Sequence, residues 1–488
     1  MIKRIILGLL TFVLSFSVLS TVFADTTGSI VVNGTTEGKT YEIYKIFDLT
    51  YSGDNVAYTI DSDWKNFFED SGDEYIVEEN SGTLNPITIE NVTKYINVTE
   101  ENIEKFTQDA LTYASKLTTS DYSAIADDDS LTFNNLELGY YLVYPQGATD
   151  IIEGNGSICS ITSTMPNATV NIKAEYPTIK KEVDDQNAEV GQLVNFTITG
   201  MVPDTTGYTT YTYKIDDTMT DGLQFDSNTA EFTVKFGETL IEVVPVYNEN
   251  GFTLTFDMVN YQEYVGQKIT VTYKVRVTEE AVNSDTTMNS ATLTYSNNPK
   301  DTTTTTTTPI EIPVYTSEIN VIKVDAKDTE VKLAGASFVI QNESGLYYQA
   351  IDEAGTIITN TTTTSSVAKV NWVEDEEEAS LLITDSTGII TFKGIENGTY
   401  YLIEIEAPDG YNKLADKVMV KVGYDTEDET SLGTVAVSHD VEVKNNSGTQ
   451  LPQTGGIGTT LFMIIGGMIA ITSAIILITN KRMSKESL

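Results

Sequence analysis

The chain has 488 residues, 71 of them acidic against 29 lysines and arginines, for a formal net charge of −42. This acidity argues against a nucleic-acid-binding protein, which needs a basic surface. The single cysteine, Cys159, excludes an intrachain disulfide, and the single histidine, His439, excludes an HExxH site. We therefore expect no metal site, no cofactor and no enzyme that acts on an external substrate.

The first 24 residues have the pattern of a cleaved signal peptide. Lys3 and Arg4 precede an apolar run over 5–22, and Thr21-Val-Phe-Ala24 has the small-x-small ending of a cleavage site. We therefore expect the rest of the chain to be exported, and its length leaves room for roughly three domains of about 100–200 residues.

Short segments rich in Val, Ile, Thr and Tyr predict an all-β protein of tandem β-sandwich domains. The best helical pattern covers 98–114, with Thr99 as N-cap, so the N-terminal domain should contain a minor helix. The extended segment 175–178 indicates one boundary, and the threonine run 302–308 is either a linker or a strand-to-strand loop. The predicted domains are 25–174, 175–316 and 317–447.

Three polar residues of the second domain alternate with apolar neighbours in predicted strands. Lys181, Asp217 and Asn289 each have apolar residues two positions away. Because successive side chains of a strand point to opposite faces, all three are expected to point into one core.

The third domain repeats this arrangement. Glu404 lies in GTYYLIEIEAPDGYN (398–412), where Tyr400 and Leu402 share its face. Lys323 lies on the first predicted strand of this domain and Asn445 on the last, both on apolar faces. A lysine, a carboxyl group and an asparagine should therefore meet in the core.

Burial gives these groups a specific chemistry. A desolvated lysine has a depressed pKa and becomes a nucleophilic amine, while a desolvated carboxyl has a raised pKa and can polarise an asparagine carbonyl as an acid. Attack of the amine on the amide releases ammonia and leaves a Lys–Asn isopeptide bond. The alternative is a buried salt bridge or a snorkelling side chain.

The strand around Glu404 resembles a known family motif. YYLIEIEAPDGY (400–411) matches the Y-x-L-x-E-x-x-A-P-x-G-Y box of Gram-positive pilins and of SpaA-like, collagen-adhesin B-type domains. The second domain is similar to the fimbrial isopeptide-forming domain. The resemblance implies immunoglobulin-like (Cna-type) sandwiches, catalytic acids at Asp217 and Glu404, and crosslinks Lys181–Asn289 and Lys323–Asn445.

The first domain departs from this pattern. Its segment 138–145, LGYYLVYP, looks like the same box, but Tyr144 stands where the acid should be. Lys45 is then a relic of the reactive lysine, and we expect no isopeptide bond in this domain.

Residues 448–488 resemble a three-part sortase signal. The motif Leu451-Pro452-Gln-Thr454-Gly455 precedes an apolar run over 459–479, long enough for a transmembrane helix, and a basic tail. A sortase cysteine would attack the Thr454 carbonyl and pass the chain to an amine.

The receiving amine separates two functional hypotheses. The resemblance implies a structural subunit of a covalently polymerised, cell-wall-anchored pilus. In such a pilin the amine is the lysine of a W-x-x-x-V-x-V-Y-P-K motif, whereas this chain has Thr178 after Tyr-Pro and no preceding tryptophan. Lys173 or Lys180 could substitute. The alternative is a monomeric wall-anchored adhesin or a basal or minor pilin.

The resemblance also implies a set of partners. These are class C (pilin) and housekeeping sortases, identical subunits in a head-to-tail fibre, peptidoglycan, minor pilins and a host ligand.

Overall fold

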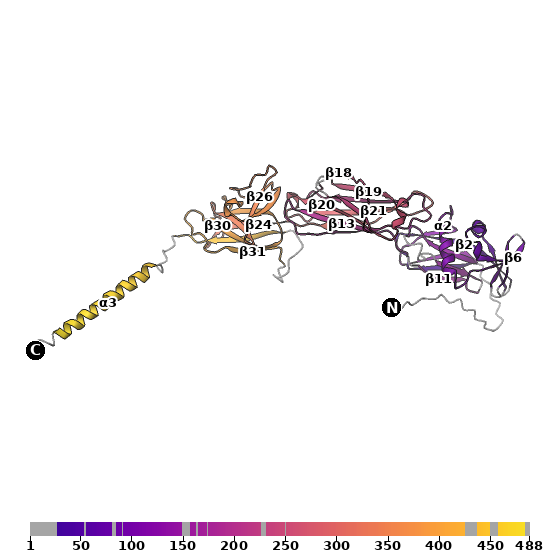
Figure 1. Ribbon diagram of the computed structural model, residues 1–488, viewed down its shortest axis with the longest axis horizontal. Helices are drawn as coiled ribbons and strands as arrows, with labels where there is room; N and C mark the ends of the chain where they lie inside the picture. Colours follow the sequence, from indigo (N-terminus) through magenta and orange to yellow (C-terminus); the bar gives the residue numbers. More distant parts are fainter. Residues whose placement is uncertain are drawn as a thin grey trace.

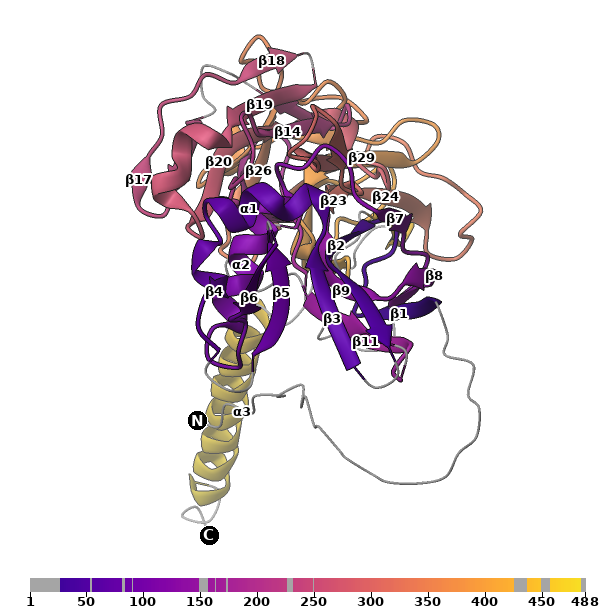
Figure 2. The same ribbon diagram turned by 90° about the vertical axis from the view of Figure 1, so that its right-hand side faces the viewer.

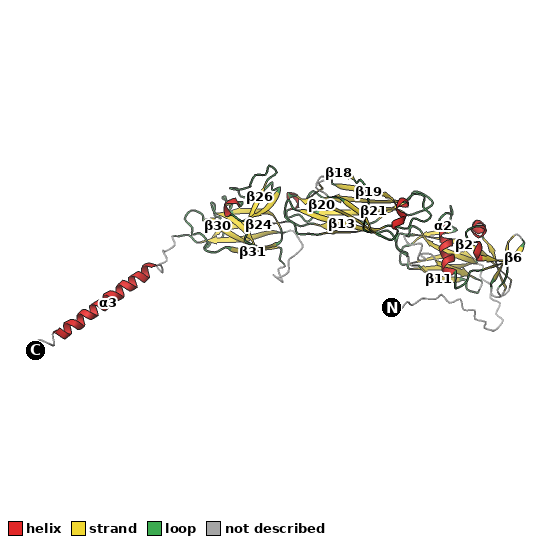
Figure 3. Cartoon of the chain, viewed as in Figure 1, coloured by secondary structure: helices red, strands yellow, loops and turns green. Residues whose placement is uncertain are grey.

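The computed structural model describes residues 27–52, 55–80, 84–89, 91–148, 157–162, 164–172, 174–225, 231–248, 250–424, 437–448 and 457–483. Figure 1 shows three groups of sheets in a row along the long axis, in chain order. Strands dominate each group, as Figure 3 shows, which confirms the all-β prediction. We call the groups the first (β1–β11), second (β12–β23) and third (β24–β32) sandwich.

The first sandwich has a three-stranded sheet of order β11-β1-β8 and an eight-stranded sheet of order β10-β9-β2-β3-β5-β6-β4, in which β7 also pairs with β2. α1 and α2, labelled in Figure 2, contribute buried residues to one core with β2, β5 and β9. The elements are β1 Thr27–Asn33, β2 Thr40–Ser52, β3 Asn55–Ile60, α1 Lys65–Glu69, β4 Ile76–Val77, β5 Asn85–Ile89, β6 Val92–Ile96, α2 Ile103–Ala114, β7 Tyr122–Ile125, β8 Ser130–Glu137, β9 Gly139–Pro145, β10 Ser157–Ile161 and β11 Asn167–Asn171.

The predicted helix forms but starts later than expected. α2 begins at Ile103 with Asn102 at the cap position, so the assignment of Thr99 as N-cap is wrong. The Asn102 side chain accepts a hydrogen bond from the Thr99 backbone N–H at 2.7 Å, which stabilises a turn ahead of the helix. Phe106, Ala110 and Leu111 are buried, as amphipathic spacing predicts.

The second sandwich packs two six-stranded sheets around one core. One has the order β12-β13-β20-β16-β17 with β15 on β20, and the other β18-β19-β14-β21-β22 with β23 on β21. The strands are β12 Lys180–Val183, β13 Leu193–Met201, β14 Thr212–Met219, β15 Leu223–Phe225, β16 Thr233–Phe236, β17 Thr239–Leu240, β18 Val246–Asn248, β19 Gly251–Asp257, β20 Lys268–Val277, β21 Met288–Ser296, β22 Thr304–Thr306 and β23 Ile310–Pro313.

The threonine run is partly a strand. Residues 304–306 form β22, which pairs with β21, so the interpretation of 302–308 as a linker or loop is wrong for its centre. Threonine is β-branched and suits a half-exposed edge strand, which explains why a low-complexity sequence is ordered here.

The third sandwich pairs a three-stranded sheet of order β29-β24-β32 with a six-stranded sheet of order β27-β26-β25-β30-β31, in which β28 pairs with β25. Both sheets bury apolar residues in one core. The strands are β24 Ser317–Asp325, β25 Ser337–Asn342, β26 Tyr347–Ile351, β27 Lys369–Val373, β28 Leu382–Ile383, β29 Ile389–Ile395, β30 Gly398–Glu406, β31 Val418–Val422 and β32 Ser438–Asn445.

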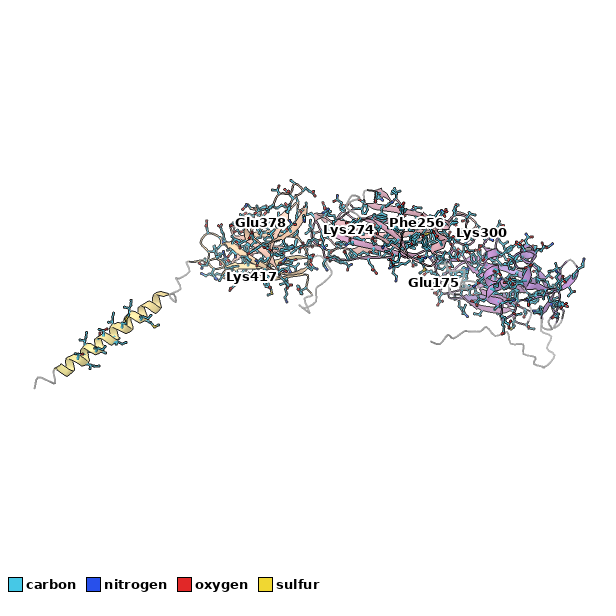
Figure 4. All side chains as sticks on the ribbon, viewed as in Figure 1. Glu175, Phe256, Lys274, Lys300, Glu378 and Lys417 are labelled. Carbon is cyan, nitrogen blue, oxygen red and sulfur yellow. The ribbon has the colours of Figure 1, made fainter. Side chains whose placement is uncertain are left out.

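The first and second sandwiches meet through two lysines. Lys300, labelled in Figure 4 at the end of the second sandwich, donates to Glu42 at 3.0 Å and to the Tyr44 hydroxyl. Lys39 donates to the Tyr295 hydroxyl at 2.6 Å. These contacts of the seam are therefore polar, and both lysines are partly buried against tyrosines.

The second and third sandwiches share backbone hydrogen bonds. The Val190 N–H donates to the Gly394 carbonyl at 3.0 Å, and the Val370 N–H donates to the Val190 carbonyl at 2.9 Å. The Val190 side chain is buried in the core of the third sandwich. Beside it, the Trp372 indole N–H donates to Glu189 at 2.5 Å. This joint is therefore built like part of a sheet rather than like a linker.

We predict that this joint weakens as the pH rises. Burial raises the pKa of Glu189 to about 7, with Glu396 and Asp185 adding to the effect and the Trp372 hydrogen bond opposing it. Because the unfolded carboxyl has an ordinary pKa near 4.5, the folded chain binds more protons between these values. Stability is therefore fully present below the unfolded pKa and falls by up to about 3 kcal/mol as the pH rises through 7.

Calorimetry at pH 5, 6, 7 and 8 and constant ionic strength measures this effect. Glu189→Gln keeps an oxygen acceptor for Trp372 but cannot ionise, so it should flatten the pH dependence and raise the melting temperature at pH 8. Parallel pH profiles for the variant and the native chain would contradict the prediction.

The C-terminal helix α3 spans Ile457–Met483 and lies beyond the third sandwich in Figure 1. Among the described residues, no helix has the length and apolar character that a membrane crossing requires. The prediction of a transmembrane helix is therefore not supported.

Candidate functional site

The fold of the third sandwich brings its lysine and asparagine onto neighbouring strands. β24 lies between β29 and β32 and runs parallel to β32, with Lys323 opposite Val443 and Asp325 opposite Asn445. Lys323 and Asn445 point into the same core because the side chains of both strands alternate between core and solvent. Glu404 comes from β30 in the facing sheet.

These three side chains touch one another and are shielded from water. The Lys323 Nζ donates to the Asn445 Oδ1 at 2.6 Å, and the Asn445 Nδ2 donates to the Glu404 Oε1 at 2.8 Å. Nζ also lies 3.7 Å from Oε1, and the side chains of Lys323 and Glu404 are both 0% exposed. The second Glu404 oxygen accepts the Leu414 backbone N–H at 2.7 Å.

The setting favours a reactive amine. Burial lowers the pKa of Lys323 to about 8, and the nearby Glu404 carboxylate only partly opposes this shift. A substantial fraction of the amine is therefore neutral near physiological pH, which is the nucleophilic form. The amine and the carboxyl group contact the same amide, one at its oxygen and one at its nitrogen. This is a suitable arrangement for transfer of the acyl group from nitrogen to nitrogen.

The second sandwich assembles a related set from both of its sheets. Lys181 comes from β12 in one sheet, while Asp217 and Asn289 come from the neighbouring strands β14 and β21 in the other. All three side chains are buried. Asn289 lies on β21, which β22 and β23 follow, whereas Asn445 lies on the last strand of its sandwich.

A tyrosine lies at the centre of this second set. Lys181 donates to Asp217 and, at 3.0 Å, to the Tyr273 hydroxyl. Tyr273 donates to the Asp217 Oδ2 at 2.6 Å and accepts the Asn289 Nδ2 at 3.0 Å. The hydroxyl therefore contacts the lysine, the acid and the amide at once.

The surroundings of the second set favour the neutral forms of both its acid and its amine. Burial raises the pKa of Asp217, although Lys181 and Tyr273 oppose the shift, and burial lowers the pKa of Lys181 to about 8. Two buried acceptors, the Asp217 Oδ1 and the Asn289 Oδ1, lack a donor among the described residues. A proton on Asp217 would supply a donor for one such acceptor, in keeping with its role as an acid.

Two groups at these sites were not identified from the sequence. Tyr273 shares a face of β20 with Ile269, Val271 and Val275, so period-two alternation could have placed it in the core. The Leu414 N–H is a main-chain group, and nothing in its residue type indicates a hydrogen bond to Glu404.

The first sandwich contains no comparable set among its described residues around Lys45. The Lys45 Nζ pairs with Asp48 and Glu137, both at 2.7 Å. Burial opposes the effect of these ion pairs, but they outweigh it and raise the pKa of Lys45, which keeps the amine charged. Tyr144 is buried at the position expected for the acid.

The residues of the sortase signal lie outside the described part of the chain. This applies to Leu451, Pro452, Thr454 and Gly455, and also to the candidate acceptor Lys173. The other candidate, Lys180, is exposed on β12 and faces away from its buried neighbour Lys181.

Two parts of the chain match known families. Residues 317–435 match SpaA, a prealbumin-like fold domain, and residues 443–485 match the LPXTG cell wall anchor motif. The fimbrial subunit type 1 of Actinomyces viscosus is 31% identical over 83 residues, which make up 17% of this chain and 15% of that protein. The chain therefore contains a SpaA-type domain and a Gram-positive cell wall anchor motif, which places it at the cell surface.

Solved structures with a similar arrangement include two pilins. The T6 backbone pilin of serotype M6 Streptococcus pyogenes has a TM-score of 0.48 and 17% identity, covering 82% of this chain and 80% of its own. The full-length major pilin SpaD from Corynebacterium diphtheriae has a TM-score of 0.46 and 18% identity, covering 88% of this chain and 99% of its own.

Proposed function

We propose that this chain is a structural subunit of a covalently polymerised surface pilus, strengthened by isopeptide bonds in its second and third sandwiches. The proposal depends on two Lys–acid–Asn sets that are buried away from water in consecutive sandwiches. The same chain carries a cell wall anchor motif. Such bonds would give an exported protein without disulfides another covalent restraint. The proposed domains are 25–174, 175–316 and 317–447.

The reaction in the third sandwich joins Lys323 to Asn445. The neutral Nζ attacks the Cγ of Asn445, the new C–N bond forms, and the tetrahedral intermediate collapses as Nδ2 leaves. The Nδ2 already contacts the Glu404 Oε1, so the acid can deliver the proton that converts the leaving group to ammonia. Glu404 then takes up the proton that Nζ loses as it becomes an amide nitrogen, because Nζ lies 3.7 Å from the same oxygen. Lys181, Asp217 and Asn289 have the corresponding roles in the second sandwich. The protein acts once on itself and on no external substrate.

The proposed anchoring step uses Thr454. Sortase cleaves between Thr454 and Gly455 and transfers the threonine carbonyl to an amine. During polymerisation by a pilin sortase, this amine is a lysine of the next identical subunit, and a housekeeping sortase finally transfers the fibre to peptidoglycan. An open head-to-tail contact of this kind gives a fibre rather than a closed ring. Minor pilins and a host ligand complete the proposed set of partners.

The acceptor lysine departs from the family motif, because Thr178 occupies the place of the motif lysine. Lys173 and Lys180 flank this position, and of the two only Lys180 is described, as an exposed residue. Lys181 is buried and is used by the proposed crosslink. The threonine at the place of the motif lysine also favours the second candidate function, a monomeric wall-anchored adhesin, in which neither Lys173 nor Lys180 accepts the Thr454 carbonyl.

Cell-wall extracts separated on a denaturing gel test the polymer. We expect a ladder of high-molecular-weight species, and tandem mass spectrometry of digested fibres should show Leu-Pro-Gln-Thr454 branched to Lys173 or Lys180. Lys→Arg substitution at the true acceptor should abolish the ladder, because arginine keeps the charge but lacks the nucleophilic amine. The same change at the other lysine serves as the control. A single band with a branch to wall peptide alone would identify a monomeric adhesin.

A further inference from the structure

The two reactive sets differ in how the acid contacts the amide. In the third sandwich, the Glu404 Oε1 accepts the Asn445 Nδ2 directly at 2.8 Å. In the second sandwich, the Asn289 Nδ2 donates to the Tyr273 hydroxyl at 3.0 Å, and that hydroxyl donates to the Asp217 Oδ2 at 2.6 Å. Aspartate is one methylene shorter than glutamate, so a hydroxyl between acid and amide extends its reach.

We propose that Tyr273 is a proton relay for isopeptide formation in the second sandwich, passing a proton from Asp217 to the departing nitrogen of Asn289. The inference rests on the proposed crosslink between Lys181 and Asn289. Tyr273 is 1% exposed, so water cannot easily substitute for its hydroxyl. Its neighbours Phe196 and Phe252 hold the ring with centroids 5.9 and 4.9 Å away.

Lys181 gives a proton to the Asp217 Oδ2, and the neutral Nζ attacks the Cγ of Asn289, which forms the new C–N bond. The hydroxyl then reverses its hydrogen bonds: it accepts the proton from Asp217 while its own proton moves to Nδ2. The Cγ–Nδ2 bond breaks and ammonia leaves. The second proton of the Lys181 ammonium passes to the Asp217 carboxylate and is then released to solvent, so Tyr273 and Asp217 end as they began.

The chain offers a matched control for removal of the hydroxyl. Tyr213 lies in the same core, is 0% exposed, and its hydroxyl has no hydrogen-bond partner among the described residues. Tyr213→Phe therefore removes a buried hydroxyl from the same sandwich without touching the reactive set. The third sandwich provides an internal reference, because its acid contacts the amide without a tyrosine.

The test follows the full chain after cell-free synthesis, with samples quenched over time and the mass of the second-sandwich peptides measured. Tyr273→Phe should slow the loss of ammonia in the second sandwich by on the order of 100-fold. The reaction in the third sandwich, and both reactions in Tyr213→Phe, should keep the native rate. Placing 3-fluorotyrosine at 273 changes the acidity of the hydroxyl but hardly changes its shape, so the rate should shift with this residue only if the hydroxyl transfers a proton.

Each outcome bears on the relay. A native rate for Tyr273→Phe would overturn it, and so would a slow Tyr273→Phe combined with an unchanged rate for 3-fluorotyrosine, since this pattern indicates a purely structural hydroxyl. If the native chain loses no ammonia from its second sandwich, then the proposed crosslink itself fails and the relay fails with it. Loss of ammonia in the native chain with no response to either change would overturn the relay alone.

Discussion

Glu404→Ala and Asp217→Ala should each be only about 17 Da lighter than the mass that its own sequence predicts, because each removes the acid for one isopeptide bond and so retains one ammonia. The native chain should be lighter than its sequence by about 34 Da, one ammonia for each bond. The effect is all-or-none for each site, since the buried acid contacts the reacting groups directly: Glu404 the Asn445 Nδ2, and Asp217 the Lys181 amine.

Neighbouring carboxylates provide matched controls for both substitutions. Glu406 lies two residues after Glu404 on β30 but is exposed, and Asp216 precedes Asp217 on β14 and pairs with Lys214 near the surface. Glu406→Ala and Asp216→Ala should keep the full mass loss. Intact-mass spectrometry, followed by digestion to locate the branched peptides, measures all four variants. A native chain with the mass of its unmodified sequence would contradict the central proposal.

The positions of the six reactive residues could be expected from strand alternation. A strand with apolar residues on both faces forces a carboxyl such as Glu404 to point inward, and the same argument applies to Lys181 and Lys323. The alternation of side chains along each strand was enough to predict that these residues are buried. Their mutual contacts required tertiary structure, because Asp217 and Lys181 come from different sheets.

Other features depend on particular hydrogen bonds that residue patterns do not show. The later start of α2 follows from a local one, between the Asn102 side chain and the Thr99 N–H, and the remaining cases involve more distant partners. The order in 304–306 comes from pairing with β21. The joint at Val190 could not be predicted, because it depends on contacts with Gly394 and Val370 that lie far along the chain. Tyr273 was missed for a different reason. A tyrosine on the apolar face of a strand is ordinarily interpreted as a core residue, so nothing in the pattern indicates a role in the reactive set.

The largest expected effect on stability is at the third sandwich. Lys323 and Asn445 lie 122 residues apart, so a bond between them closes a large ring and restricts the unfolded chain. By analogy with a disulfide of similar span, this ring stabilises the folded state by about 4–5 kcal/mol. Lys323→Met removes the amine with little change in side-chain volume, so it should lower the melting temperature of this sandwich by on the order of 15 °C.

The same bond determines which strands bear a pulling force. The chain enters the third sandwich at β24 and leaves it at β32, and these strands are parallel neighbours that the proposed bond between Lys323 and Asn445 would join. With the bond, tension passes directly from one strand to the other, and the residues between them bear little load. Without it, the two strands can slide apart, and trypsin gains access to the opened sandwich.

Lys323→Met and Asn445→Ala should therefore be cleaved by trypsin in the third sandwich but not in the second. Lys444 is an exposed lysine on β32, so Lys444→Ala serves as the control and should resist cleavage as the native chain does. Equal trypsin resistance in all four proteins would mean that the lysine and asparagine are held only by hydrogen bonds, and that the load follows the strands.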